Sequence, residues 1–355
     1  MRFDTGFLLN AIGQAREVLA ARIHRTPLVY DSDTKRAPIL LKCENLQWTG
    51  SCKIRGAAYR MAGLSPAEKA RGVITYSDGN HAIAVASVAR DTGTAAVVVM
   101  SRHAAPQAVA AVRRYGGSVV LIDSGGDAGR AVTRVLAAEG GYVLIDPSDD
   151  LDVILGQGTI GLEIVDQMSP GEDFAVFVPL GAGALLAGIA LAVKQSWPKA
   201  QVIGVKLCDG SRFASSLSFN RRLCHEVPEL GISGSGASEV AMVRTLGELP
   251  SALVERYVDK VAVVSDSEIV DAVLLAHDRM HLVVEPLGIL AYAAARRFPP
   301  RRGGAVAVLS GGNVSSSYVN ELRALQQEHR LSLEADFQGG TAGKARMMGW
   351  REASL

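Results

Sequence analysis

Several residue classes that would indicate a particular kind of protein are scarce in this sequence. Only four of its 355 residues are cysteine, at positions 43, 52, 208 and 224, and they form neither a CxxC pair nor the His/Cys spacing of a zinc site. We therefore expect unpaired thiols in a reducing cytoplasm, and we interpret Cys52 as a small apolar filler.

An excess of either charge sign is also missing. The chain has 37 Lys and Arg against 36 Asp and Glu, a formal net charge of +1, so its charge favours neither nucleic acid nor an anionic membrane as a partner. The longest apolar run, residues 180–193, is interrupted by glycines and is too short to span a bilayer. The first residues lack the pattern of a signal peptide, and we expect a cytoplasmic protein.

What the sequence does have is a high content of apolar and small residues. Hydrophobic residues make up 48% of the chain, glycine accounts for 37 residues, and aromatics make up only 5%. This composition suits helices packed closely on a parallel sheet. Strand-like and helix-like runs alternate, which predicts an α/β fold with doubly wound parallel sheets, and the length allows two domains.

The expected elements follow from apolar spacing. We expect helices over 6–23, 106–115 and 128–139, and further helices that begin near Lys53, Asn80, Thr159 and Ala184. We expect strands at 39–42, 73–76, 95–100, 119–122, 142–145, 174–179, 202–207, 260–264 and 305–309.

Four short segments contain the residues that could do chemistry. The first is Ser51-Cys52-Lys53-Ile54-Arg55-Gly56-Ala57, where a lysine lies in a turn of small residues. The other three each follow a strand-like run: Ser77-Asp78-Gly79-Asn80-His81, Gly181-Ala182-Gly183-Ala184-Leu185 and Ser310-Gly311-Gly312-Asn313. Open parallel sheets place ligands at the carboxyl ends of their strands, so we expect these segments to form one site.

Each segment allows a chemical and an ordinary structural interpretation. A partly desolvated Lys53 could act as a nucleophile, whereas most lysines are surface charges. The small residues at 181–185 let backbone N–H groups turn toward one anion at a helix start, or simply let the helix pack tightly. Asn80 could bind a ligand or cap a helix.

In this order and spacing the four segments resemble the fold-type-II pyridoxal-phosphate (PLP) enzymes, in the branch of threonine dehydratase and serine racemase. The resemblance extends from about Arg25 to Ser315. It implies that Lys53 bonds to the cofactor and later removes the substrate Cα proton, and that Ser77 helps to hold the substrate carboxylate. The cofactor contacts that it implies are Asn80 at the 3′ oxygen, Gly181, Ala182, Gly183, Ala184 and Leu185 at the phosphate, Ser310 at the pyridine nitrogen, and Glu285 near the ring.

Asp78 departs from the dehydratase pattern, in which a small residue is common. The resembled position is an aspartate in diaminopropionate ammonia-lyases, where it is a base. Across the cofactor from Lys53, Asp78 could exchange the Cα proton of a D-substrate or pair with a cationic side chain. The alternative is a cap on the following helix. Our candidate catalytic residues are therefore Lys53, Asp78 and Ser77.

We expect no metal site. Serine racemases and their relatives bind a divalent cation through a glutamate and an aspartate after the strand that corresponds to 202–205. Lys206 stands at the place of the glutamate, and Asp209 alone is a poor cage for a hard cation. Substrate selection is expected around Trp48–Gly50 and in 234–239, a segment that matches the family pattern only loosely.

The resemblance predicts an ammonia-lyase that converts a threonine-like or serine-like β-hydroxy amino acid into a 2-keto acid and ammonia. The alternatives are a racemase that uses Lys53 and Asp78 as two bases, or an ammonia-lyase acting on 3-hydroxyaspartate or 2,3-diaminopropionate. A homodimer is expected because the family usually forms dimers. We expect a large PLP-binding domain from 1–71 and 150–320, a small inserted α/β domain at 72–149, and a C-terminal helix and polar tail at 321–355.

Overall fold

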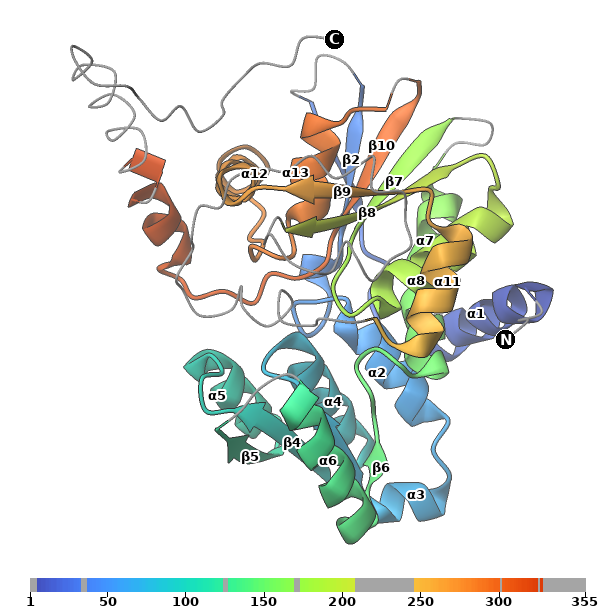
Figure 1. Ribbon diagram of the computed structural model, residues 1–355, viewed down its shortest axis with the longest axis vertical. Coiled ribbons are helices and arrows are strands. Elements are labelled where there is room, and N and C mark those ends of the chain that lie inside the picture. The colour runs from blue at the N-terminus through green and yellow to red at the C-terminus, as the bar shows by residue number, and fades with distance from the viewer. Residues whose placement is uncertain are drawn as a thin grey trace, which may run out of the picture.

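The computed structural model describes residues 5–32, 37–123, 127–168, 173–207, 246–300, 302–324 and 326–327. Its strands form one sheet of six strands and one of four, each flanked by helices (Figure 1). The predicted α/β fold with two parallel sheets is confirmed, with one antiparallel strand at the edge of the larger sheet. No helix of the described part of the chain is long and apolar enough to cross a membrane.

The larger sheet has the strand order β1-β2-β10-β7-β8-β9. Its strands are β1 (Leu28–Asp31), β2 (Ile39–Cys43), β7 (Phe174–Pro179), β8 (Gln201–Leu207), β9 (Lys260–Val264) and β10 (Gly304–Leu309). β1 was not among the expected strands. β1 pairs antiparallel with β2 at the sheet edge, and Pro27 lies just before the strand, where its missing N–H removes no ladder bond.

The smaller sheet has the order β5-β4-β3-β6, and all its neighbouring strands are parallel. Its strands are β3 (Val73–Tyr76), β4 (Ala96–Ser101), β5 (Ser118–Ile122) and β6 (Val143–Leu144). The helices between them are α4 (Asn80–Thr92), α5 (Pro106–Arg114) and α6 (Asp127–Gly140). All these elements come from the stretch expected as the small domain; the domain boundaries themselves stay a prediction.

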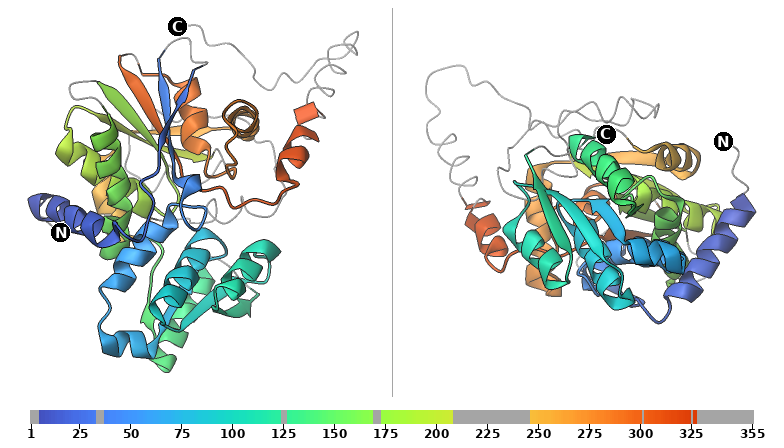
Figure 2. Two further views of the ribbon diagram at one scale, coloured as in Figure 1. Left: turned by 180° about the vertical axis from the view of Figure 1, so that it is seen from behind. Right: turned by 90° about the horizontal axis from the view of Figure 1, so that it is seen from below.

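Two helical layers cover the larger sheet (Figures 1 and 2). On one face pack α1 (Thr5–Leu19), α7 (Leu151–Gln167), α8 (Ala184–Ser196) and α11 (Glu248–Tyr257); on the other pack α12 (Asp266–Met280) and α13 (Leu290–Arg297). Successive residues of a strand point to opposite faces. Val176 and Val178 of β7 accordingly join the first layer, whereas Ala175 and Phe177 join the second.

The helix that we expected to begin near Thr159 begins much earlier. α7 spans Leu151–Gln167, and Asp150 caps it by accepting hydrogen bonds from the N–H groups of Asp152 and Val153. Gly156 lies inside the helix because α7 packs directly on α2 (Lys53–Ala62) there: a Cβ at Gly156 would lie 2.6 Å from the Arg55 carbonyl oxygen. The glycines of this stretch permit a close helix crossing and do not mark a helix start.

Three further expectations need correction or lie wholly or partly outside the described residues. α1 ends at Leu19, although helical spacing had suggested residue 23, because the chain turns there toward β1. The segment 234–239, where substrate selection was expected, lies outside the described residues. α3 (Pro66–Arg71) and the short 3₁₀ turn η1 (Glu44–Leu46) were not anticipated. The expected C-terminal stretch 321–355 is described only for helical residues up to 327.

Candidate active site

The start of α2 lies directly beside the turn after β10. The Cys52 N–H donates to the Ser310 carbonyl oxygen at 2.9 Å, and the Gly312 N–H donates to the Gly50 carbonyl oxygen at 2.8 Å. Ser51 and Gly311 form an isolated antiparallel bridge between these two bonds. The first and fourth predicted segments therefore meet, and Lys53 is the first residue of a helix whose start is held by backbone bonds.

Side-chain bonds bring the second segment to the same place. Asn80 begins α4, and its Nδ2 donates to Glu285 Oε1 at 2.6 Å. Asn313 Nδ2 donates to Asn80 Oδ1 at 2.7 Å and to the Thr49 carbonyl oxygen at 2.8 Å. The chain Thr49–Asn313–Asn80–Glu285 thus links segments from both sheets. Asn313 belongs to the fourth predicted segment, but no role was expected for it. Its position next to Gly311 and Gly312 could have indicated that it lies in the site.

Glu285 is held in a tight, weakly solvated position. Loss of solvation raises its pKa to about 7, although the hydrogen bonds from Asn80 and the Asn313 N–H, and the nearby charge of Lys53, act in the opposite direction. A Cβ at Gly311 would lie 2.5 Å from Glu285 Oε1 and 2.9 Å from Asn80 Nδ2. Glycine at 311 is therefore what allows Glu285 and Asn80 to meet over the end of β10.

Ser77 and Asp78 occupy the end of β3, just before α4. Ser77 is buried, and its Oγ accepts a hydrogen bond from the Gly79 N–H at 3.3 Å. Asp78 Oδ1 accepts from the Ser101 N–H, and Oδ2 accepts from the Tyr76 hydroxyl at 3.3 Å. Desolvation raises the pKa of Asp78 against the effect of these two bonds. These two bonds tie the Asp78 carboxylate to the small sheet.

The segment Gly181-Ala182-Gly183-Ala184-Leu185 joins β7 to α8 as expected. Gly183 adopts a left-handed conformation (φ +98°) at the helix N-cap, and a Cβ there would lie 2.7 Å from both Leu246 Cδ2 and Pro250 Cβ. The first N–H groups of a helix have no partner within it, and they attract anions. α8 packs on α7, which packs on α2, so this loop is tied to the Lys53 helix through α7.

Several buried polar atoms at the start of α2 and α4 lack a hydrogen-bond partner among the described residues. They are Thr49 Oγ1, Ser51 Oγ and His81 Nδ1. Burial, assisted by the charge of Lys53, lowers the pKa of His81 to about 4, so this ring is neutral. Buried polar atoms are nearly always hydrogen-bonded. A polar group bound here would complete them, and a lysine amine, amide donors and an anion-binding helix start together fit PLP.

The two cysteines within the described ranges are free and buried. Burial raises the pKa of Cys43 and of Cys52 to about 12, so both remain protonated at neutral pH, as expected for apolar fillers. Cys208 and Cys224 lie outside the described residues. Within the described part, no three His, Cys, Asp or Glu side chains converge as a possible metal site, and Asp209 lies beyond it.

Known proteins match this chain over most of its length. The chain is 36% identical over 318 residues to an L-threonine ammonia-lyase of Thermotoga maritima, which covers 88% of this chain and 77% of that protein. It is 35% identical over 328 residues to the catabolic L-threonine dehydratase TdcB of Escherichia coli K12, covering 90% and 97%. The solved structure of maize serine racemase superposes with a TM-score of 0.77 at 29% identity, covering 91% and 98%.

A family model gives the same result. The model of the pyridoxal-phosphate dependent enzymes matches residues 19–311, a range that includes Lys53, the Asn80–Glu285 pair and the first residues after β10. The predicted fold, cofactor and enzyme class are thereby confirmed. The chain belongs to the family of pyridoxal-phosphate dependent enzymes.

Proposed function

We propose that this enzyme is an ammonia-lyase that removes water from a β-hydroxy amino acid of the threonine and serine class and releases a 2-keto acid and ammonia. The observation that carries the proposal is the place of Lys53, at a helix start bonded to the Ser310–Gly312 turn and beside the Asn80–Glu285 pair. The names of the Thermotoga maritima and Escherichia coli relatives support the reaction and the substrate class.

In this proposal Lys53 has two tasks. Its amine would hold the cofactor, and the same amine would take the proton from the substrate Cα. PLP, when bound, supplies the electron sink that makes this proton acidic. The start of α2 is held by the Cys52–Ser310 and Gly50–Gly312 bonds, so the lysine stem leaves a fixed point. A fixed stem would hold the amine in one place for both tasks.

Other residues hold the cofactor. We assign Asn80 to its 3′ oxygen, Ser310 to its pyridine nitrogen, and the N–H groups of 181–185 to its phosphate. The Asn80–Glu285–Asn313 hydrogen bonds support the first assignment because they fix the amide orientation of Asn80. The helix start at Ala184 supports the phosphate assignment, since both the helix dipole and the unpaired N–H groups favour an anion.

Ser77 and the first N–H groups of α4 are assigned to the substrate carboxylate. Ser77 lies where β3 ends and α4 begins, three residues before the helix start. The Ser77 Oγ–Gly79 N–H bond supports this assignment because it orients the hydroxyl over the helix start. A carboxylate bound at this point would orient the substrate so that Cα faces Lys53.

The direct test is product release by the purified, cofactor-loaded enzyme. L-serine, D-serine, L-threonine, both 3-hydroxyaspartate diastereomers, phenylserine and 2,3-diaminopropionate are supplied separately, and ammonia and 2-keto acid are measured. Release from L-threonine or L-serine at the highest kcat/KM is the expected result. Absence of ammonia from every β-hydroxy amino acid, by an enzyme whose spectrum still changes on adding them, would contradict the proposal.

Racemisation is the second candidate. It is favoured by the likeness to serine racemase and by Asp78, a carboxylate at the end of β3 whose pKa is raised by desolvation. In this reaction Lys53 and Asp78 would act on opposite sides of Cα. Asp78→Asn keeps the hydrogen-bond acceptor toward Ser101, and it would abolish racemisation while leaving elimination from L-serine intact. If Asp78→Asn changes neither reaction, Asp78 serves only to accept the hydrogen bonds from Ser101 and Tyr76, since it does not cap α4.

The remaining assignments are organisational. We propose the domain division at residues 72 and 149, supported by the two separate sheets, a homodimeric assembly, and a cytoplasmic location. Size-exclusion chromatography with light scattering tests the dimer. A single subunit mass at micromolar concentration would contradict it.

A further inference from the structure

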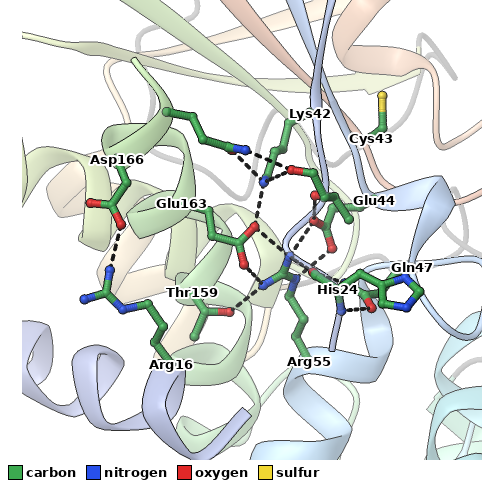
Figure 3. Close-up of polar contacts among 12 residues, drawn as sticks. Arg16, His24, Lys42, Cys43, Glu44, Gln47, Arg55, Thr159, Glu163 and Asp166 are labelled. Carbon is green, nitrogen blue, oxygen red and sulfur yellow. Dashed lines mark hydrogen bonds and ion pairs between the residues drawn. The ribbon is translucent and has the colours of Figure 1, made fainter. Parts of the chain in front are cut away.

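Behind Lys53 lies a buried cluster of charges centred on Arg55, from the first turn of the same helix (Figure 3). Arg55 Nε and Nη2 donate to the two carboxylate oxygens of Glu44, each at 2.8 Å. Arg55 Nη1 and Nη2 donate to the two oxygens of Glu163 on α7 at 2.7 and 3.0 Å. One guanidinium therefore bridges two carboxylates through four hydrogen bonds.

A second cation closes the cluster. Lys42 Nζ on β2 donates to Glu163 Oε2 at 2.6 Å, to the Thr26 carbonyl oxygen at 2.7 Å and to Gln167 Oε1 at 2.9 Å. Thr26 Oγ1 in turn donates to Glu44 Oε1 at 2.5 Å. The group Lys42, Glu44, Arg55 and Glu163, which we call the rear network, thus contains two cations and two anions.

The rear network is sealed from solvent. Lys42, Glu44 and Arg55 have no exposed surface, and Glu163 is 4% exposed. Burial acts to lower the pKa of both Lys42 and Arg55, but the two carboxylates outweigh it at Arg55, whose pKa lies above its usual value. The same cations hold the pKa of Glu163 below its usual range. Lys42, Glu44 and Glu163 each form an ion pair at 2.6–2.8 Å, and Arg55 pairs with both carboxylates.

The rear network and Lys53 lie on opposite sides of one helical turn. Successive helix residues are rotated by about 100°, so side chains two positions apart point about 200° apart. Lys53 and Arg55 have this spacing. Arg55 points back toward α7 and η1 (Figure 3), and its carbonyl lies against Gly156 of α7. Rotation of the first turn of α2 would therefore have to break the Arg55 bonds.

We propose that the rear network is a positioning device for Lys53, a statement that rests on the role proposed for that lysine. Arg55 is bound at four points from two sides, by Glu44 in the segment before α2 and by Glu163 in α7. A bidentate hydrogen-bonded pair holds its two side chains in one relative orientation, whereas apolar contacts let side chains slide past each other more easily. The network fixes the rotation of the α2 first turn, and with it the direction in which Lys53 leaves the helix.

Arg55→Lys is the informative variant because it keeps the charge and removes the fork. Asp31→Asn is the matched control: Asp31 is 3% exposed and pairs with Tyr292 and Arg296 in the other helical layer, away from α2. Glu163→Gln is the second variant, for use if Arg55→Lys fails to fold, since it keeps the side-chain shape. All are compared with wild type by hydrogen exchange of residues 51–57 and by steady-state kinetics of the loaded enzyme.

The expected result has two parts. In the cofactor-free protein, Arg55→Lys and Glu163→Gln speed amide exchange in residues 51–57 at least tenfold, and Asp31→Asn does not. In the loaded enzyme, the two network variants lower kcat at least tenfold with KM changed less than threefold, whereas Asp31→Asn keeps kcat within twofold even though it lowers the melting temperature.

Unchanged exchange in residues 51–57, or faster exchange with a wild-type kcat, would overturn the proposal and leave the network a purely structural feature. Failure of the proposed function is seen separately, in the wild type. Borohydride reduction and peptide mapping of the loaded wild-type enzyme would then find no cofactor on Lys53, in which case Lys53 has no cofactor to be positioned against and the inference also falls.

Discussion

The two sides of the first turn of α2 differ in whether their polar side chains have partners within the chain. On the rear side, two cations face two anions and the charged atoms of Arg55 and Lys42 are hydrogen-bonded. On the front side, Thr49 Oγ1 and Ser51 Oγ are buried without a partner among the described residues, and Glu285 has a pKa raised to about 7. The rear has its partners within the chain, whereas the front is completed by a ligand.

This difference leads us to expect that substitutions on the two sides affect stability and activity differently. A buried ion pair contributes little net stability, but loss of one partner is costly because the other charge stays buried alone. Unpartnered polar groups lower stability in the free protein and become favourable when a ligand binds. Substitutions on the front should therefore impair chemistry with little effect on folding, whereas substitutions on the rear should lower stability as well as kcat.

The largest expected effect is on the front side. Lys53→Ala should lower ammonia release by at least about 10³-fold, because it removes both the bond to the cofactor and the proton acceptor. Its free energy of unfolding without cofactor should change by less than about 0.5 kcal/mol, since Lys53 is partly exposed and alanine favours helices. Kinetics and urea unfolding measure the two quantities. Strong destabilisation by Lys53→Ala would contradict the proposed difference between the two sides.

On the rear side, Arg55→Met should reduce the free energy of unfolding by about 3–5 kcal/mol, because it leaves Glu44 and Glu163 buried with only Lys42. Urea denaturation at pH 7 measures this loss. Adding Glu163→Gln should recover part of it by removing one unpaired carboxylate. A loss below about 1 kcal/mol for Arg55→Met would show that the network is hydrated and weakly coupled.

Because of Glu285, we expect the free energy of unfolding to fall as the pH rises, whereas a carboxylate in an ordinary ion pair has the opposite effect. Its folded pKa of about 7 exceeds its ordinary value of 4.5, so the folded state binds the proton more tightly than the unfolded state. Stability from this group is present below pH 4.5 and is lost as the pH rises through 7. In cofactor-free protein, Glu285→Gln should be more stable than wild type at pH 8, by at most about 3 kcal/mol, and equal at pH 4.5. A difference that does not vary with pH would contradict this assignment.

The smallest effects concern two helical glycines. Gly156→Ala should destabilise by about 1–3 kcal/mol because its Cβ would lie 2.6 Å from the Arg55 carbonyl oxygen and push α7 from α2. Gly13→Ala, on α1, is the control: nothing lies within 4 Å of its Cβ, so it should stabilise by about 0.5–1 kcal/mol. Thermal unfolding compares them. Equal effects would mean that the α2–α7 contact is not tight.

Much of the front side was predictable from the sequence, because it is local. Each glycine-rich segment follows an apolar run, and parallel strands bring their ends to one edge, so Lys53, Asn80 and Ser310 could be placed near one another without coordinates. Their individual roles stay predictions. The Asn80–Glu285 bond joins residues 205 positions apart, and no local pattern indicated it.

The rear network was not predicted because its charge pairs also join residues that are far apart in the sequence. Arg55 and Glu163 are 108 positions apart. The available signal was a charge within an apolar element, as at Lys42 in β2 and Glu163 in α7, where a buried charge requires a partner. The early start of α7 was missed because helical glycines usually weaken a helix, and here the close contact with α2 outweighs that cost.

The most direct test of the account is to locate the cofactor bond. The purified enzyme is loaded with PLP, reduced with borohydride, digested, and its peptides are mapped by mass spectrometry. The account predicts one phosphopyridoxyl group per chain, on Lys53, and none on Lys42 of the rear network. A label on another lysine, or no label on a protein that binds PLP stoichiometrically, would contradict the assignment of Lys53 and the front-and-rear division built on it.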